Sequence, residues 1–266
     1  MASASLRSGQ LLAGWLSDSA IVSAVARWLG QTATAATPPR TAEPVPGIGL
    51  VSMGALRRLT PISRSWGYER GGPIDRYYIE GFLAEHQHDV RGHVLEIQND
   101  RYTRLFGGDR VTKSDVLDMN PANRRATIIA DLTAADALAS ETFDCIIFTQ
   151  TLHAIDDPRP VVETLYRILK PGGILLATLP GISQVREQDW GGYWSGGHRS
   201  ARVMFARVFG ASAVEIRTYG NVLAAIAFLQ GLGALELRRD ELDYHDPAYE
   251  VSIAIRAVKA SSDTAP

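Results

Sequence analysis

Short apolar segments alternate with helical stretches from residue 74 onward, and this alternation strongly constrains the fold. Apolar, β-branched segments occupy residues 93–97, 111–117, 126–130, 143–148, 174–179, 213–218 and 251–257. Helical spacing fits 74–83, 158–169, 199–209 and 222–232, and the Pro-Gly-Gly at 171–173 is expected to end the second helix. Strands that alternate with helices predict a doubly wound α/β fold around a mostly parallel, seven-stranded sheet. The last strand is expected at or near an edge.

The N-terminal 48 residues differ in composition from the rest of the chain. Leu11–Leu29 is apolar but interrupted by polar residues, which favours an amphipathic helix over a signal peptide. Residues 31–48 are rich in Ala, Thr and Pro, as linkers are. We expect an N-terminal helical extension and linker over 1–48, the main domain over 49–260 and a disordered tail over 261–266. The helix could pack on the main domain, join two subunits of a homodimer or lie on a membrane surface.

Charge and cysteine content limit the possible partners. The chain has 29 acidic and 27 basic residues, a net charge of -2, so no global field attracts nucleic acid or an anionic membrane. No apolar run is long enough to suggest a membrane span. Cys145 is the only cysteine, which rules out an internal disulfide, disfavours a cysteine zinc site and fits the cytoplasm. We therefore expect a small-molecule partner and no metal.

Polar residues follow the first four predicted strands, where doubly wound sheets bind their ligands. Glu96 lies near the end of the first strand, and Asp115 lies about 20 residues further on, the spacing of an acid that binds ribose hydroxyls. Asp131 and Leu132 follow the third strand, where an acid and an apolar side chain could hold adenine. Asp115 could instead be a surface acid, and either aspartate could cap a helix.

The order of these motifs resembles class I S-adenosylmethionine (SAM)-dependent methyltransferases. The similar stretches are VLEI, KSDVL, IIADL, FDCIIFTQTLHAIDDP and LKPGGILLATLP, within residues 90–182. Upstream, LRRLTPISRSWGYERGGPIDRYYIEGFL resembles a bacterial subgroup associated with glycosylation and specialised metabolites, which extends the likeness to residues 54–258. The resemblance implies a Rossmann-like methyltransferase fold and SAM as cofactor. It places the cofactor near Arg76, Tyr77, Glu96, Gln98, Asp115, Val116, Asp131, Leu132, Thr149 and Gln150.

The first motif departs from the family pattern. Members usually carry E-x-G-x-G-x-G, whose glycines let the backbone approach the cofactor, but this chain has Gln98 where the first glycine would stand. Either the loop takes another path, or SAM binds weakly or not at all. The lack of G-x-G-x-x-G also disfavours a nicotinamide enzyme, because no phosphate is cradled.

Three residues are candidates for catalysis. His153 follows the fourth strand and can act as a base near neutral pH, although it could simply orient the loop. His198 begins the helix after the fifth strand and could instead be a solvent-exposed helix residue. Tyr78, in the upstream motif, would line the reaction site.

Aromatic residues suggest an acceptor pocket. Trp190, Tyr193 and Trp194, with Asp189, lie in a probable loop and could form a stacking wall, or only a lid or core contact. Tyr68 would join this wall from the upstream motif. Arg70 or Arg76 could pair with the SAM carboxylate, or could make a structural ion pair with Asp75 or Glu80.

These features predict methyl transfer to a small molecule of bacterial specialised metabolism, either a sugar-bearing metabolite or an indole-bearing, peptide-like aromatic compound. The alternative is a non-catalytic, methyltransferase-like binding or assembly module, which Gln98 and the N-terminal helix motivate. A nucleic-acid methyltransferase is disfavoured by the balanced charge and by the lack of an N/D-P-P-Y motif after the fourth strand.

Overall fold

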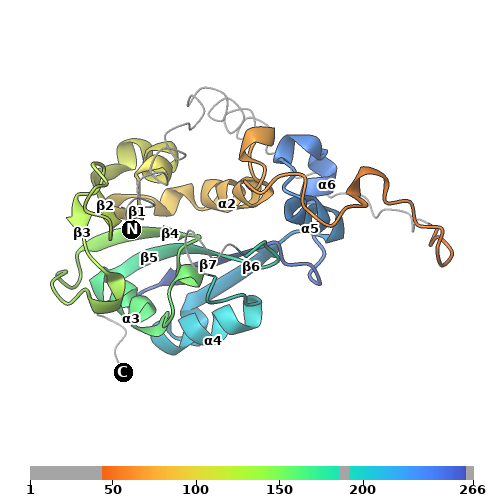
Figure 1. Ribbon diagram of the computed structural model, residues 1–266. Coiled ribbons are helices and arrows are strands. Elements are labelled where there is room, and N and C mark those ends of the chain that lie inside the picture. The colour runs from red at the N-terminus through yellow and green to blue at the C-terminus, as the bar shows by residue number, and fades with distance from the viewer. Residues whose placement is uncertain (1–43, 186–191, 262–266) are drawn as a thin grey trace, which may run out of the picture. The chain divides into compact units, whose positions relative to one another are not determined.

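A seven-stranded sheet organises the described part of the chain, residues 44–185 and 192–261 of a computed structural model (Figure 1). The strand order is β3-β2-β1-β4-β5-β7-β6, and β7 alone runs antiparallel to its neighbours. The strands are β1 (Gly92–Ile97), β2 (Val111–Asp118), β3 (Ile128–Ile129), β4 (Phe143–Thr149), β5 (Leu169–Pro180), β6 (Val214–Tyr219) and β7 (Ser252–Val258). The predicted doubly wound, mostly parallel fold is confirmed. The strand order reverses between β1 and β4, and a ligand crevice is expected beyond their carboxyl ends.

Helices cover both faces of this sheet. They are α2 (Ile74–Glu85), α3 (Arg159–Ile168), α4 (His198–Phe209), α5 (Val222–Leu229) and α6 (Arg239–Asp243). In Figure 1, α3 and α4 lie below the sheet, and α2, α5 and α6 lie above it. Burial on both faces explains why the central strands are almost continuously apolar.

Two apolar clusters hold these layers together. Below the sheet, Phe148, Leu175 and Ile255 pack with Leu165 of α3 and Phe205 of α4, all fully buried. Above it, α2, α5 and α6 meet in a cluster that contains Ile74, Tyr78, Phe228, Leu242 and Val251. The second cluster fixes α2 beside the start of β7, so the upstream motif becomes part of the wall above the sheet.

Several sequence-based boundaries differ from the structure. α3 ends at Ile168, just ahead of the Pro-Gly-Gly at 171–173 as expected, but β5 already begins at Leu169, so these three residues lie within a strand. β3 spans only Ile128–Ile129, and α6 was not predicted. β7 lies next to the edge strand β6, as expected of a strand near an edge. The predicted N-terminal helix, most of its linker and nearly all of the C-terminal tail lie outside the described residues.

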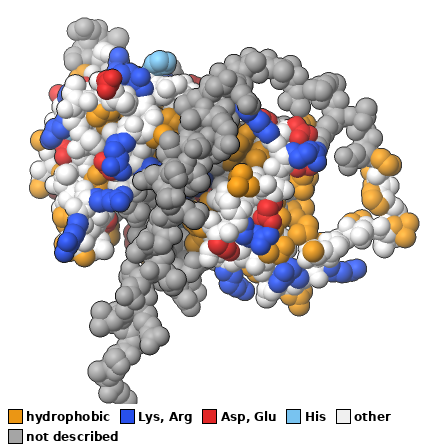
Figure 2. Space-filling model, turned by 90° about the horizontal axis from the view of Figure 1, so that it is seen from above, with side chains coloured by type: hydrophobic (Ala, Val, Ile, Leu, Met, Phe, Trp, Pro, Cys, Tyr) orange, Lys and Arg blue, Asp and Glu red, His pale blue; other side chains and the backbone are white. Residues whose placement is uncertain are grey.

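Charge on the visible surface is mixed. On the face that Figure 2 shows, acidic and basic side chains of the described residues lie interspersed. Within residues 44–185 and 192–261, no helix combines the length and hydrophobicity needed to cross a bilayer.

Candidate functional site

The loops that follow β1 and β4 start in the same unusual backbone conformation. Gln98 and Gln150 have φ angles of 67° and 47°, in the left-handed region that favours glycine. The Gln98 N–H donates to the carbonyl of Leu117 at 2.9 Å, and the Gln150 N–H donates to the carbonyl of Thr178 at 2.9 Å. Both loops therefore turn sharply at the point where the strand order reverses. At Gln98 the chain keeps the left-handed geometry that a glycine would adopt easily.

Asp118 is the acid at the tip of β2, and sequence analysis missed it. Its Oδ2 accepts from Asn123 Nδ2 at 2.7 Å, and the same Nδ2 lies 2.7 Å from the carbonyl oxygen of Gln98. Its Oδ1 accepts from the Asn120 N–H at 2.9 Å. Asp118 is half-buried, so a carboxylate is held beside the loop after β1. The apolar pair that precedes it, Val116-Leu117, was the signal that the strand continued.

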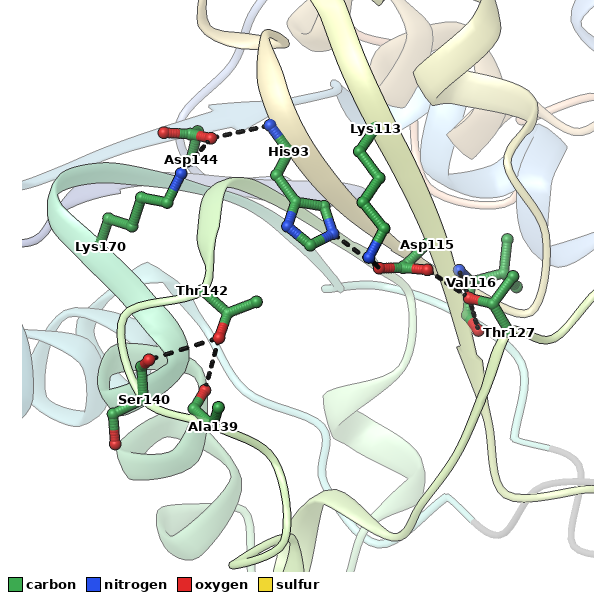
Figure 3. Close-up of polar contacts among 10 residues, drawn as sticks. All are labelled: His93, Lys113, Asp115, Val116, Thr127, Ala139, Ser140, Thr142, Asp144 and Lys170. Carbon is green, nitrogen blue, oxygen red and sulfur yellow. Dashed lines mark hydrogen bonds and ion pairs between the residues drawn. The ribbon is translucent and has the colours of Figure 1, made fainter.

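Asp115 lies within β2 instead of at its end, so the expected position is wrong. Its carboxylate lies 2.6 Å from His93 Nε2, 2.8 Å from Thr127 Oγ1 and 2.9 Å from Lys113 Nζ (Figure 3). Although burial opposes the shift, these hydrogen bonds lower the pKa of the Asp115 carboxyl. Val116 is buried, and its N–H donates to Thr127 Oγ1 at 3.0 Å. The ribose role of Asp115 stays a prediction, and Asp118 is better placed for it.

Glu96 anchors the turn that follows the β1 loop. Its carboxylate accepts from the backbone N–H groups of Tyr102 at 3.1 Å and Thr103 at 2.7 Å, and from Thr103 Oγ1 at 2.8 Å. The π-helical turn Thr103–Gly107 is thereby held against β1. Burial raises the pKa of Glu96 to about 7. Both carboxylate oxygens serve this turn, and contact of Glu96 with a cofactor stays a prediction.

The residues after β3 cap a short turn. Asp131 Oδ1 accepts from the Thr133 N–H at 2.9 Å and from Thr133 Oγ1 at 2.8 Å, as in the capping alternative. The turn is a 3₁₀ helix, Leu132–Ala134, and Leu132 is buried in the core below the sheet. Binding of adenine by Asp131 and Leu132 therefore stays a prediction.

The upstream aromatic residues pack mainly against helices. The Tyr78 hydroxyl donates to the Leu242 carbonyl at 3.0 Å, and its ring stacks on Tyr219 with centroids 5.7 Å apart. The Tyr77 hydroxyl donates to Asp243, and burial raises the pKa of both tyrosines. These contacts favour packing over catalysis for Tyr78.

Arginines of the upstream motif pair with other groups of the described chain. Arg76 donates to the Tyr102 hydroxyl at 3.0 Å, which connects α2 to the turn held by Glu96. Arg70 pairs with Glu236 instead of with Asp75 or Glu80. Tyr68 lies in the 3₁₀ turn Tyr68–Arg70 before α2.

His153 lies in the loop after β4. Burial lowers its pKa, which favours the neutral imidazole. Its Nδ1 is buried and has no hydrogen-bond partner among the described residues. Its carbonyl accepts from the N–H groups of Tyr193 at 3.1 Å and Trp194 at 3.3 Å, and Trp194 Nε1 donates to the Ile155 carbonyl at 2.7 Å. Two predicted wall residues therefore lie beside the predicted base.

Asp189 and Trp190, the other two predicted wall residues, lie outside the described residues. His198 begins α4, and its imidazole Nδ1 contacts the carboxylate of Glu250. Sequence analysis missed Glu250, because 52 positions separate it from His198.

Unpaired polar atoms gather at the carboxyl edge of the sheet. In the described part of the chain, buried side-chain atoms without a partner include Gln150 Nε2, Thr178 Oγ1 and Ser252 Oγ. Ser252, at the start of β7, pairs with Pro180 at the end of β5 and with Tyr219 at the end of β6. Leaving such atoms unpaired costs about 1–3 kcal/mol each. A polar ligand at this edge would satisfy them, so the residues present fit a nucleoside cofactor.

An open cavity lies at the opposite edge, lined by Arg91, Arg110, Asp144 and Gly172 among others. It is at the amino ends of the strands, away from the switch point, so we do not place the site there. Asp144 pairs with Lys170 at 2.7 Å beside it (Figure 3). No group of three or more metal-ligating side chains occurs in the described ranges.

Residues 91–177 match the model of a protein family described as a methyltransferase domain. The match covers β1 to most of β5, so the two left-handed loops and Asp118 all lie within the matched stretch. Among curated proteins, none matches the chain.

Solved structures of methyltransferases are similar to this chain at low sequence identity. A SAM-dependent methyltransferase from Archaeoglobus fulgidus is 12% identical, with a TM-score of 0.48 over 69% of this chain and 94% of that one. The N-methyltransferase NodS from Bradyrhizobium japonicum is 16% identical, with a TM-score of 0.45 over 71% and 97%. A phosphoethanolamine N-methyltransferase from Haemonchus contortus, solved with S-adenosylhomocysteine, is 14% identical, with a TM-score of 0.43 over 64% and 50%. The fold assignment rests on the sheet topology itself.

Proposed function

We propose that this protein transfers a methyl group from SAM to a small-molecule acceptor. The observation that carries the proposal is the meeting of Gln98, Asn123 and Asp118 at the switch point of the sheet. A carboxylate at the tip of β2, beside a sharply turned loop, suits the hydroxyl pair of a ribose. The match of residues 91–177 to a methyltransferase domain supports SAM as the nucleoside.

The cofactor would be held by loops on both sides of the switch point. Asp118 would accept hydrogen bonds from the ribose, and Asp131 with Leu132 would face the adenine. Gln150, whose buried Nε2 has no partner in the described chain, would donate to the cofactor from the β4 side. SAM supplies a methyl group already activated by a positively charged sulfur, so the protein's main task is alignment in a dry crevice.

The acceptor would enter from the side of His153 and Trp194. Tyr193 and Trp194 have 62% and 49% of their surface exposed, so both rings are free to stack on a flat or sugar-like acceptor. We keep the predicted acceptor class, a sugar-bearing or aromatic metabolite of bacterial specialised metabolism. We also propose that the enzyme lies in the cytoplasm and acts as a homodimer joined through its N-terminal helix.

Calorimetry with the full chain tests cofactor binding. We expect heat with SAM and with S-adenosylhomocysteine, and Asp118→Ala should weaken SAM binding by about 1–3 kcal/mol, the cost of a lost charged hydrogen-bond partner. Asp115→Ala is the matched variant, because the sequence alone assigned ribose binding to Asp115. If that assignment holds, Asp115→Ala and not Asp118→Ala will weaken SAM binding. The proposal fails if neither compound binds the wild-type chain.

A screen of candidate acceptors by mass spectrometry then tests transfer. The expected product is heavier than its acceptor by one CH₂ unit and forms only with SAM. Cofactor binding without transfer to any acceptor would favour the non-catalytic binding module over the enzyme.

A further inference from the structure

Glu250 holds His198 by two contacts. One carboxylate oxygen contacts the imidazole Nδ1, and the other accepts from the backbone N–H of His198 at 2.8 Å. The Glu250 side chain is 15% exposed and that of His198 is 43% exposed. The carboxylate is thus mostly buried, whereas the imidazole reaches solvent.

This contact selects one tautomer of His198. An ionised carboxylate can only accept hydrogen bonds, so Nδ1 must carry the proton that it shares with Glu250. In the neutral ring, Nε2 then has a free lone pair and can accept a proton. This arrangement of a carboxylate, an imidazole and a free Nε2 is that of an oriented general base.

The backbone places Glu250 firmly at the carboxyl edge of the sheet. Its carbonyl accepts from the Ile182 N–H at 2.7 Å, just after β5, and the next residue, Val251, donates to the Tyr219 carbonyl at 2.8 Å. Gly181 lies so close that a Cβ there would be 2.0 Å from the Glu250 carbonyl oxygen. The dyad therefore lies on the same edge as the unpaired Ser252 hydroxyl.

We propose that His198 is the general base for a hydroxyl-bearing acceptor and that Glu250 is its positioning residue. This inference rests on the proposed function and narrows it to O-methylation. As the acceptor oxygen forms its bond to the methyl carbon, the methyl–sulfur bond breaks and its electron pair stays on sulfur. The hydroxyl proton goes to His198 Nε2, the Glu250 carboxylate stabilises the resulting imidazolium, and the half-exposed ring returns the proton to solvent.

The tautomer can be tested without any acceptor or cofactor. In nuclear magnetic resonance spectra of the full chain labelled with ¹⁵N-histidine, neutral His198 should carry its proton on Nδ1. His198→Ala assigns the signal, and Glu250→Ala should give a mixture of tautomers that Glu250→Asp restores at least in part. A wild-type His198 protonated on Nε2 would overturn the proposal, whether or not the protein is a methyltransferase.

Kinetics with an acceptor from the mass-spectrometric screen tests the role in transfer. His198→Ala should lower kcat by on the order of 10²-fold, the usual size of a general-base contribution. Glu250→Ala should lower kcat at unchanged SAM affinity, with partial rescue in Glu250→Asp. The control is His245→Ala, because His245 is exposed and its Nε2 contacts Thr218 Oγ1, away from Glu250. A kcat of His198→Ala equal to that of wild type, or methylation on carbon, would overturn the role of the dyad and leave the proposed methyl transfer standing. The absence of any product with the wild-type chain would instead count against the proposed function.

Discussion

Glu96 makes the stability of the protein depend on pH. Burial raises its pKa from 4.5 to about 7, so between these values the folded state binds a proton more readily than the unfolded chain. The stabilisation by protonated Glu96 is complete below pH 4.5 and is lost as the pH rises through 7. The free energy of unfolding should therefore fall across this window, by at most about 3 kcal/mol from this residue.

Urea unfolding at a series of pH values checks this slope. Glu96→Gln removes the titration and should flatten the curve relative to wild type, while weakening the hydrogen bonds to the turn at Thr103. Glu163→Gln, at an exposed position of α3, should leave the slope unchanged. If wild type and Glu96→Gln show the same slope, Glu96 titrates as an ordinary surface acid.

Gln98 carries strain that glycine would relieve. A left-handed conformation costs an L-residue about 1–2 kcal/mol. Glycine avoids this cost but loses more backbone entropy on folding, which offsets roughly 0.5–1 kcal/mol of the gain. With φ at 67°, Gln98→Gly should stabilise the protein by about 0.5–1 kcal/mol in chemical denaturation. Gln98→Ala is the matched control, since it removes the side chain and keeps the strain. Equal gains from both variants would show that the side chain, and not the backbone, is responsible.

At the scale of elements, the junction of β5 and β7 depends on one close approach. An alanine at Gly181 would place its Cβ 2.0 Å from the Glu250 carbonyl oxygen, so one strand end must move. Gly181→Ala should lower the free energy of unfolding by about 1–3 kcal/mol, the usual cost of overpacking. Gly197→Ala, whose Cβ would lie 3.3 Å from a Glu250 side-chain oxygen, should cost less. The reverse order in thermal denaturation would contradict this packing.

The strands could be predicted because their apolar runs are local signals, whereas their ends and partners are not. Asp115 was placed after the strand because of its spacing from Glu96, yet it lies within β2 and contacts His93 of β1 and Thr127 ahead of β3. Pro171 and the two glycines after it looked like the end of a helix only. They also lie within β5, between the residue pairs Phe143–Leu169 and Cys145–Ile174, where the register of β5 against β4 shifts. In both cases tertiary contacts override the local signal.

At the scale of the whole molecule, the site is assembled from distant parts of the chain. Sequence analysis found His153 and His198 because histidines after strands are visible in the sequence. It missed Asp118, which shares Asn123 with the loop after β1, and Glu250, which reaches α4 from the start of β7. Glu250 meets His198 only in the folded sheet, so no local pattern could assign it, whereas Asp118 was missed because Asp115 lies at a similar spacing from Glu96.

Because the proposed cofactor would join loops on both sides of the switch point, its binding should stabilise the described domain as a unit. By mass action, SAM at roughly one hundred times its Kd should raise the free energy of unfolding by about 2.7 kcal/mol. Differential scanning fluorimetry of the full chain should show a rise in Tm with SAM in wild type and in Glu250→Ala. Asp118→Ala at the same SAM concentration should show a smaller rise, and dilution of SAM should abolish the shift. Equal rises in Tm for wild type and Asp118→Ala would show that Asp118 does not bind the nucleoside. Loss of the rise in Glu250→Ala would place Glu250 in the cofactor site instead of beside the acceptor.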